Sequence, residues 1–283
     1  MAISTTTTLN DLYANIVQAA LYTLSEQTVI RPLVRNYNMV GTPGLVAQVP
    51  IYGALTASGI AEDADLIGTP STFSTDVATI TAAEIGVGVE LTDIAREGAA
   101  EDIAAAVGRQ MGDALAKKVD QDLASLFSGF TNVVGSGAAE LTVDSFFQAA
   151  AILRANQAPG PYVAVIHPYQ AYQIKKQLTN AGATMSHNLS EVGNTALRDG
   201  FVGRLAGIDI FESTVVTGAS SGAFEGAVMS GDAIGYMLKR DMRIEEERNA
   251  SKRATEFVGT MAYGVKEIFD VYGVKLLGDA QIN

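Results

Sequence analysis

The most reactive side chains in this 283-residue chain are a serine in a glycine-rich segment and two histidines. Gly218, Ser220 and Gly222 match the G-x-S-x-G pattern of serine hydrolases, in which a strained turn from a strand to a helix exposes the nucleophile. The residues that follow, AFEGAVM, have strand character, and both His167 and His187 precede the serine. Hydrolases of this type place the catalytic histidine last. We therefore favour a Gly/Ser turn between strands, and keep a serine hydrolase that uses Ser220 as an alternative.

No pattern in the chain predicts a metal or cofactor site. There is no cysteine, and neither histidine has a partner at metal-ligand spacing. Gly135 and Gly137 do not begin a dinucleotide-binding motif, because Glu140 stands where the third glycine would be. His167 lies between an apolar run and a proline, so we expect it to make a hydrogen bond at a strand end. The prediction is a protein with no catalytic, cofactor-binding or metal-binding residues and no enzymatic activity.

Composition and charge exclude further classes of protein. The chain is 48% hydrophobic, which is ample for a core, and its formal net charge is −12. Proteins that read nucleic acids draw most of their affinity from Lys and Arg at phosphates, so this charge argues against that class. No run of about 18 apolar residues predicts a transmembrane helix. The N-terminus, MAISTTTTLND, does not read as a secretory signal, so we expect the protein to stay where it is made.

One long segment has no obvious place in a core. Residues 49–75, VPIYGALTASGIAEDADLIGTPSTFST, hold apolar side chains at neither helical nor sustained strand spacing. They include three Gly and two Pro, and acidic residues without any Lys or Arg, so a compact helix or central strand is not expected. Loops of this length are uncommon inside a domain, and this one is too apolar for plain disorder, so we predict that it packs on a partner surface. The candidate contact residues are Ile51, Tyr52, Leu55, Ile60, Glu62, Asp63, Asp65, Leu66 and Phe73.

Charge is also unevenly placed along the chain. Residues 1–116 carry 13 Asp and Glu against four Arg and no Lys. This asymmetry would suit an acidic arm laid on a more basic neighbouring surface. A solvated acidic face that aids solubility explains it equally well.

Apolar spacing predicts the elements of the first half of the chain. A modest helix follows Asn10, and the segment TVIRPLVRNYNMVGTPG reads as extended because two prolines interrupt it. Alternation in EIGVGVEL predicts a half-buried strand over 84–91. The strongest helical signal covers 99–127, where apolar residues recur every fourth position and form a stripe that winds around the helix. Gly135 and Gly137 are predicted to break the chain after it.

The second half mixes short helices and strands. We expect a helix that starts near Asp144, a buried strand in YVAVIHP, a helix after Pro168, and a polar stretch over 179–200. The segments GRLAGIDIFES, GAVMSGDAIGYML and MRIEEE are short strand candidates, and ATEFVGTMAYGVKEIFDVYGVKLLG is predicted to form two strands of one antiparallel sheet. The fold class is α+β, without regular βαβ alternation.

Two charged groups have a simple expected role. Lys117, Lys118, Asp120 and Asp122 are predicted to form the solvated face of the long helix. The cluster from Glu245 to Arg253 could form a charge ladder between subunits, and we favour an exposed strand and turn. The members of that cluster are Glu245, Glu246, Glu247, Arg248, Lys252 and Arg253.

Several segments, in this order, carry a family resemblance. VAVIHPYQAYQIKKQL looks like a strand, turn and helix of the major capsid protein of tailed double-stranded DNA bacteriophages, which has the Hong Kong 97 fold. VGRLAGIDIFES and GAVMSGDAIGYML are similar to the next strands of that family, and RIEEERNASKRATEFVGTMAYGVKEIFDVYGVKLL to its closing sheet strands. The resemblance covers nearly the whole chain, and it depends on order and spacing rather than on a short signature.

The resemblance implies four parts and one function. Residues 1–46 would be an N-terminal arm, 47–80 the extended loop, 81–139 with 244–283 the peripheral domain with its long spine helix, and 140–243 the axial domain. The chain would assemble with itself into hexamers and pentamers of an icosahedral virion head, built in the host cytoplasm, that encloses double-stranded DNA without sequence-specific binding. The partner surface of the loop would then be another copy of the chain. The resemblance also implies a scaffolding protein, a portal and an optional decoration protein as partners, with no membrane.

One feature departs from part of the family. Some members join subunits through a covalent bond between a loop Lys and an Asn of a neighbour, whereas no Lys precedes Lys117 here. We therefore predict a shell without that bond. An encapsulin, a cellular compartment with the same fold that encloses cargo enzymes, remains an alternative to the viral interpretation.

Overall fold

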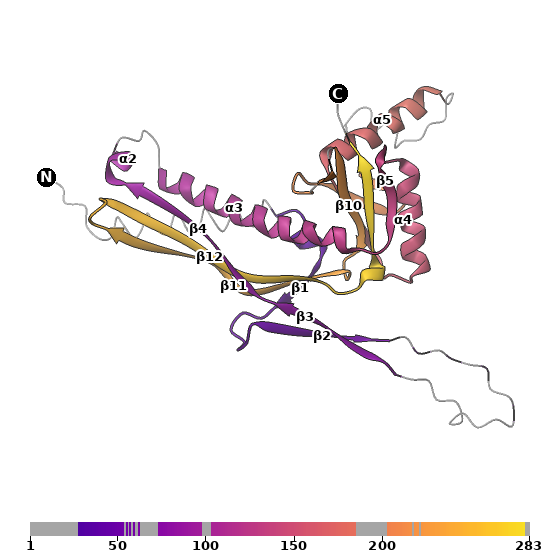
Figure 1. Cartoon of the computed structure of the whole chain (residues 1–283), viewed down its shortest axis with the longest axis horizontal. Helices are drawn as coiled ribbons and strands as arrows, with labels where there is room; N and C mark the ends of the chain where they lie inside the picture. The colour runs from indigo at the N-terminus through magenta and orange to yellow at the C-terminus, as the bar shows by residue number, and fades with distance from the viewer. Residues whose placement is uncertain are drawn as a thin grey trace.

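The computed structural model describes residues 28–53, 55, 57, 59, 62, 73–97, 103–184, 203–216, 218–220 and 222–280. The helix predicted after Asn10 and most of the polar stretch over 179–200 lie outside these residues. Figure 1 shows an elongated sheet with one long helix along it, a second and more compact unit at one end, and a hairpin that projects away from both. The helices are α2 (Asp93–Glu97), α3 (Ile103–Ser125), α4 (Val143–Ala155) and α5 (Pro168–Thr184), with 3-10 turns η1 (Arg31–Leu33), η3 (Leu126–Gly129) and η4 (Asp270–Tyr272). The strands are β1 (Arg35–Asn38), β2 (Val46–Tyr52), β3 (Thr75–Thr81), β4 (Ala83–Thr92), β5 (Val133–Glu140), β6 (Tyr162–Ile166), β7 (Arg204–Leu205), β8 (Ile208–Glu212), β9 (Gly218–Ser220), β10 (Ala223–Ser230), β11 (Ile234–Asn249), β12 (Ala254–Glu267) and β13 (Gly273–Asp279).

The elongated sheet has the strand order β1-β11-β12-β4. β4 confirms the predicted strand, because its alternate residues Ile85, Val87, Val89 and Leu91 are half-buried against the core while the residues between them are exposed or carry no side chain. β11 and β12 form a long antiparallel hairpin from Ile234↔Glu267 to Asn249↔Ala254, and Figure 1 shows it running the length of the sheet.

The helix α3 lies along this sheet and confirms the predicted apolar stripe. Met111, Leu115, Val119 and Leu123 are each at most 2% exposed and pack in one cluster with side chains of β11 and β12. Because successive members of the stripe are rotated by about 40°, the same cluster also reaches the second unit near Phe127, at the end of the helix.

The second unit is built on a seven-stranded sheet with the order β5-β13-β10-β6-β8-β7, and β9 pairs with β10. Both faces of its centre are covered. Val163 and Val165 of β6 point into the cluster shared with α3, whereas Ala164 and Ile166 point into a second cluster with Phe146 of α4. Burial on both faces explains why β6 is a continuous apolar run rather than an alternating one.

The helices of this unit have the expected starting signals. α4 begins after Thr142, whose hydroxyl accepts from the backbone N–H of Ser145 at 3.3 Å, and the Ser145 hydroxyl in turn accepts from the Thr142 N–H at 3.4 Å. This reciprocal cap satisfies two backbone donors. The predicted start near Asp144 is therefore correct to within two residues. α5 begins at Pro168, where the missing N–H costs nothing.

Three predictions of local structure were wrong. Gly135 and Gly137 do not break the chain but lie inside β5, where Gly135 has φ +92° and a side chain would collide with the carbonyl oxygen of Leu277. MRIEEE is not a separate strand, because β11 runs through it with irregular pairing near Arg240. The final segment does form two strands, but β12 lies in the elongated sheet and β13 pairs with β10 and β5 in the other.

Within the described residues, no helix combines the length and hydropathy that a membrane crossing requires.

The two larger sheets of the described structure differ in shape. They are connected by η4 and share the hydrophobic cluster at the end of α3.

Candidate assembly surface

The predicted loop begins and ends as a two-stranded hairpin. β2 and β3 pair antiparallel over seven residue pairs, from Val46↔Thr81 at the root to Tyr52↔Thr75 further out. The backbone N–H of Gly53 continues the ladder by donating to the carbonyl oxygen of Ser74 at 2.9 Å. An isolated hairpin of this size is marginally stable in water, so its root must be supported by other elements.

One face of the hairpin is anchored on the elongated sheet. Ile80 is fully buried and forms a small cluster with Ala82 and Met237, against which Ala47 and Val49 pack. Two glycines allow this close crossing. A side chain at position 264 would overlap the carbonyl oxygen of Thr81, and one at position 235 would meet Ile80 Cδ1 at 3.0 Å. Gly264 and Gly235 therefore let β3 lie directly on β11 and β12.

The other face of the hairpin is open to solvent. Tyr52 and Phe73 are 63% and 58% exposed, and their rings stack with centroids 5.7 Å apart. Leu55 is 61% exposed, and Val46 and Val77 add exposed apolar surface along the strands. Figure 1 shows the hairpin pointing away from both sheets, so the described part of the chain offers nothing that covers this face. A stacked aromatic pair held this way is the kind of anchor that protein interfaces bury.

The structure describes some of the predicted contact residues and not others. Tyr52, Leu55, Glu62 and Phe73 are exposed, as a contact with another molecule requires, and Ile51 is half-buried on the anchored face. Ile60, Asp63, Asp65 and Leu66 lie outside the described residues. The contact of all nine with another subunit stays a prediction.

A buried carboxylate holds the segment that leads into β1. Asp120 is 3% exposed and accepts hydrogen bonds from the backbone N–H groups of Val29 at 2.7 Å and Ile30 at 3.2 Å. Burial raises the pKa of Asp120, and these backbone donors oppose the increase. The prediction that Asp120 belongs to the solvated face of the long helix was wrong, since its partners lie some 90 residues earlier in the chain. Lys118 and Asp122 form an ion pair at 2.7 Å on the more exposed side.

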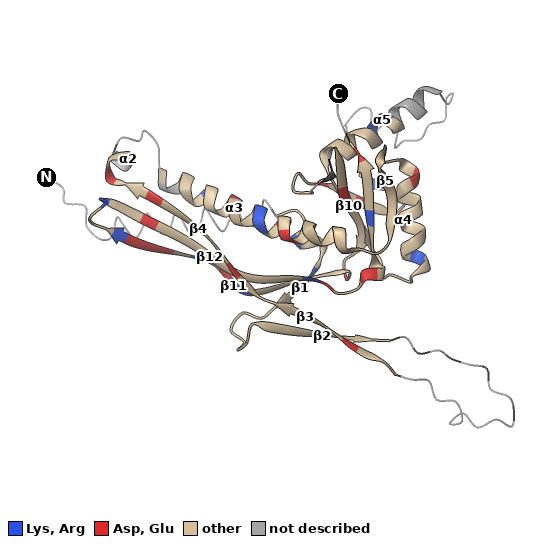
Figure 2. Ribbon diagram, in the orientation of Figure 1, with Lys and Arg blue, Asp and Glu red and all other residues tan. Residues whose placement is uncertain are grey.

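The charged cluster at the far end of β11 is paired within the chain. Arg248 contacts Asp93 at 2.7 Å, and Lys252 contacts Glu90 at 3.1 Å. Both cations donate hydrogen bonds to these carboxylates, and these bonds raise the pKa of Arg248 and of Lys252. Figure 2 shows blue and red segments interleaved where the far end of the β11–β12 pair meets β4 and α2. The cluster is therefore exposed and paired within the chain, as in the exposed strand and turn that we favoured. Exposed ion pairs of this kind each contribute little to stability.

The geometry around Ser220 does not match a nucleophile elbow. Gly218–Ser220 form β9, which pairs antiparallel with β10, so Ser220 ends a strand, and another strand rather than a helix follows Gly222. His167 accepts from the backbone N–H of Tyr169 at 3.2 Å through Nδ1, stacks on Phe224 with centroids 3.9 Å apart, and has its pKa lowered by burial. This agrees with the predicted hydrogen bond at a strand end. Within the described residues, no group of three or more His, Cys, Asp or Glu could hold a metal ion.

Solved capsid structures share this architecture. The chain superposes on the capsid protein of cyanophage P-SCSP1u with a TM-score of 0.69 at 20% identity, covering 88% of this chain and 87% of the other. Mycobacterium phage Che8 gives a TM-score of 0.71 at 19% identity, covering 88% and 90%. The capsid of a native GTA particle gives 0.68 at 14% identity, covering 90% and 91%. At these sequence identities the structural comparison establishes the fold. A search of curated proteins finds no match to the chain.

A long sheet under a spine helix, a compact second unit and a projecting hairpin define the shell-forming class of protein with the Hong Kong 97-like fold. The sequence model of one family, described as phage capsid protein, matches residues 75–275. The chain belongs to that family. It is a structural major capsid protein of the virion, which assembles with itself into the icosahedral head, and the viral interpretation of the sequence is confirmed.

Proposed function

We propose that copies of this chain form hexamers and pentamers in which the β2–β3 hairpin of each copy lies across a neighbouring copy. The exposed Tyr52–Phe73 pair carries this proposal, because two large rings are stacked on a face that no described residue covers. Burying one aromatic side chain contributes roughly 1.5–3 kcal/mol. Repeated around a closed shell, many such contacts give high avidity from modest single interfaces.

We also propose a division of the chain that follows its strand pairing. The arm corresponds to residues 1–46 and the extended loop to 47–80. The peripheral domain consists of β4, β11 and β12 with α3, and the arm adds β1 to its sheet; the axial domain consists of the seven-stranded sheet with α4 and α5. Compared with the boundaries expected from sequence, β5 and β13 move to the axial domain and all of β11 to the peripheral one.

The proposed partners and chemistry follow from the family and from composition. A separate scaffolding protein, a portal and an optional decoration protein would act with the chain, and the head would enclose DNA without sequence-specific contacts. We propose no enzymatic activity, and the strand position of Ser220 supports this. Because no Lys precedes Lys117, the hairpin has no amine for a covalent bond to a neighbour. Purified heads should therefore run as a monomer in denaturing electrophoresis, and a ladder of multimers would contradict this.

The assembly proposal is tested by removing the aromatic pair. Tyr52→Ser combined with Phe73→Ser should leave the unassembled protein folded, because both side chains are exposed, and should abolish closed particles when the assembly helpers are supplied. Circular dichroism measures folding, and sedimentation with negative-stain microscopy measures particles. The matched control, Tyr52→Phe with Phe73→Tyr, keeps both rings and should assemble normally. Normal particles from the serine variant would contradict the proposal.

A further inference from the structure

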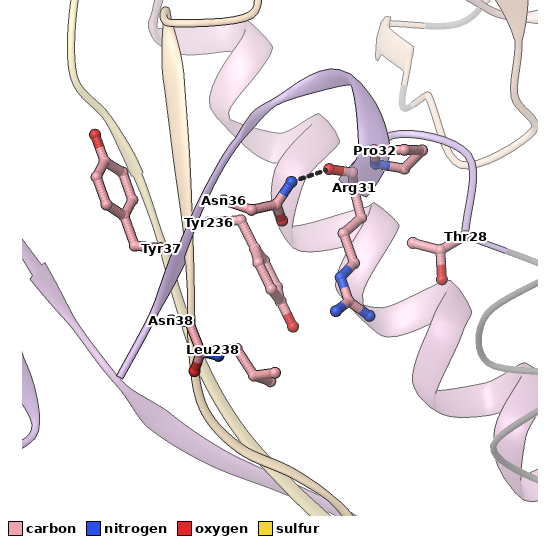
Figure 3. Close-up of a pocket in the computed structure, with 8 residues that line it drawn as sticks. All are labelled: Thr28, Arg31, Pro32, Asn36, Tyr37, Asn38, Tyr236 and Leu238. Carbon is pink, nitrogen blue, oxygen red and sulfur yellow. Dashed lines mark hydrogen bonds between the residues drawn. The ribbon is translucent and has the colours of Figure 1, made fainter. Parts of the chain in front are cut away.

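A cavity of about 510 Å³ opens between the segment that Asp120 holds and the start of β11. Figure 3 shows its lining, in which polar side chains from η1 and β1 face an aromatic ring and an aliphatic side chain from β11. The lining residues are Thr28, Arg31, Pro32, Asn36, Tyr37, Asn38, Tyr236 and Leu238.

The buried hydroxyl beside this cavity has no hydrogen-bond partner among the described residues. Tyr236 is 1% exposed, and its Oη makes no hydrogen bond to any described residue. The ring that stacks on it, Tyr263, differs, because its hydroxyl donates to Asp122 Oδ2 at 2.7 Å. Burial raises the pKa of Tyr236 to about 12, so the phenol keeps its proton and remains a donor at neutral pH. An unsatisfied buried hydroxyl is costly, and a ligand that accepts from it would remove that cost.

The cation beside this hydroxyl has no carboxylate partner among the described residues. The Arg31 guanidinium lies 5.0 Å above the centre of the Tyr236 ring, and Figure 3 shows it next to the phenolic oxygen. It forms no ion pair with the described part of the chain. The nearby Arg35 differs, because it pairs with Asp232 at 2.9 Å. Asp241 is close enough to raise the pKa of Tyr236, but its carboxylate already accepts from the backbone N–H of Met242 at 2.8 Å.

A forked cation and a hydroxyl donor on one cavity wall match a carboxylate. A guanidinium binds a carboxylate through two parallel hydrogen bonds, and such charge-assisted bonds are about twice as strong as neutral ones. The volume is far larger than one small anion needs, since a water molecule takes roughly 30 Å³ of liquid. It is sufficient for a side chain together with part of the peptide that carries it.

We infer that this cavity is a socket for a carboxylate on the hairpin loop of a second copy of the chain. The inference rests on the proposed function, in which the hairpin reaches a neighbour. Charge complementarity favours this occupant, because the loop between β2 and β3 has Glu62, Asp63 and Asp65 and no Lys or Arg. Glu62 is exposed in the described structure.

The described part of the hairpin leads away from the socket of its own copy. Tyr37 belongs to both the socket and the cluster on which the hairpin root packs, so the socket lies beside that root. From there β2 extends for seven residues, roughly 20 Å at 3.3 Å per residue, before the acidic loop begins. Figure 1 shows the hairpin pointing away from β1.

Arg31→Gln tests the socket with little change to the fold. We expect the concentration needed for particle assembly to rise by about tenfold or more, because a charge-assisted pair is lost in every subunit. The matched control is Arg35→Gln, which removes an exposed pair within the chain and should change that concentration by less than about threefold. Urea unfolding of the unassembled proteins should be the same for both variants. Equal assembly by the two variants would overturn the inference.

Tyr236→Phe separates the socket from a structural role. Removing a hydroxyl without a partner should not destabilise the unassembled protein, whereas assembly should weaken if that hydroxyl donates to a neighbour. A loss of folding stability with unchanged assembly would overturn the inference.

A double-mutant cycle identifies the occupant. The loop variant Glu62→Gln, Asp63→Asn, Asp65→Asn should weaken assembly as Arg31→Gln does, and the two together should add little further loss, because each removes one side of the same pair. Additive losses would overturn the inference. A socket for a small anion would give a different set of results. The loop variant would then assemble normally, and inorganic phosphate would stabilise the unassembled wild type but not Arg31→Gln. That combination would also overturn the inference. If the Tyr52/Phe73 serine variant fails to assemble while Arg31→Gln assembles normally, the socket is wrong and the hairpin contact stands.

Discussion

The seven-stranded sheet buries its apolar residues within the chain, whereas the β2–β3 hairpin leaves part of its apolar surface exposed. In the sheet, β6 is buried on both faces, and Phe146 of α4 is fully buried against one of them. In the hairpin only the root is covered, by a cluster centred on Ile80, and the Tyr52–Phe73 pair is exposed. The first region contains what the chain needs to fold. The second leaves apolar area exposed in the described part of the chain, so the two regions should respond differently to mutation.

The largest expected effect is in the sheet. Phe146→Ala should destabilise the unassembled protein by about 3–5 kcal/mol, because it removes a fully buried ring and leaves a cavity. The neighbouring Phe147 is 54% exposed on the same helix, so Phe147→Ala should change stability by no more than about 0.5 kcal/mol. Urea unfolding followed by circular dichroism measures both. If Phe146→Ala and Phe147→Ala lose similar amounts of stability, burial in the seven-stranded sheet does not set the cost of mutation.

A smaller effect on stability is expected at the hairpin root. Gly264→Ala places a methyl group against the carbonyl oxygen of Thr81, so β3 must move off the sheet at a cost of about 1–3 kcal/mol. Amide exchange in residues 75–81 should accelerate, and particle assembly should fall more than stability does, because the hairpin leaves the sheet in a different direction.

The matched control for the root is another glycine of the same sheet. An added side chain at Gly88 of β4 would meet nothing within 4 Å, so Gly88→Ala should leave exchange in the hairpin unchanged. If Gly264→Ala also leaves exchange and assembly unchanged, the close crossing of β3 over β12 does not set the direction of the hairpin.

The parts of this structure that were predictable from sequence are those with a local period. Alternation over 84–91 gave β4, apolar residues at every fourth position gave α3, and the exposed aromatic residues of the loop were identified as contact candidates. Each pattern depends on residues a few positions apart, which lie on one face of the same element.

The parts that were not predictable depend on neighbours far along the chain. Asp120 looks like one more charge on a helix, and only the fold brings Val29 and Ile30 to it. Gly135 looks like a break, and its reason is the nearby backbone of Leu277. Arg31 carries no local signal at all, because the ring that its guanidinium lies over, Tyr236, comes about 200 residues later.

The smallest expected effect is at the junction of the two regions. Glu267 ends β12, where the chain leaves the elongated sheet for β13, and burial together with the charge of Asp270 raises its pKa above the ordinary 4.5. A carboxyl group whose pKa is raised in the folded state binds more protons there than in the unfolded chain. Stability should therefore decrease as pH rises from about 4.5 through the raised pKa.

Glu267→Gln keeps the neutral form at every pH and tests this sign. It should stabilise the protein modestly at pH 7, and the gain should shrink as the pH falls toward and below 4.5, because the wild-type carboxyl then becomes protonated in the unfolded state as well. Glu246→Gln removes a charge from an exposed position of the same sheet and serves as the matched control. Unfolding measured from pH 4 to 8 compares them. If the stability gained by Glu267→Gln is the same at low pH, the gain comes from packing. The titration of Glu267 then does not contribute to stability at the junction of the two sheets.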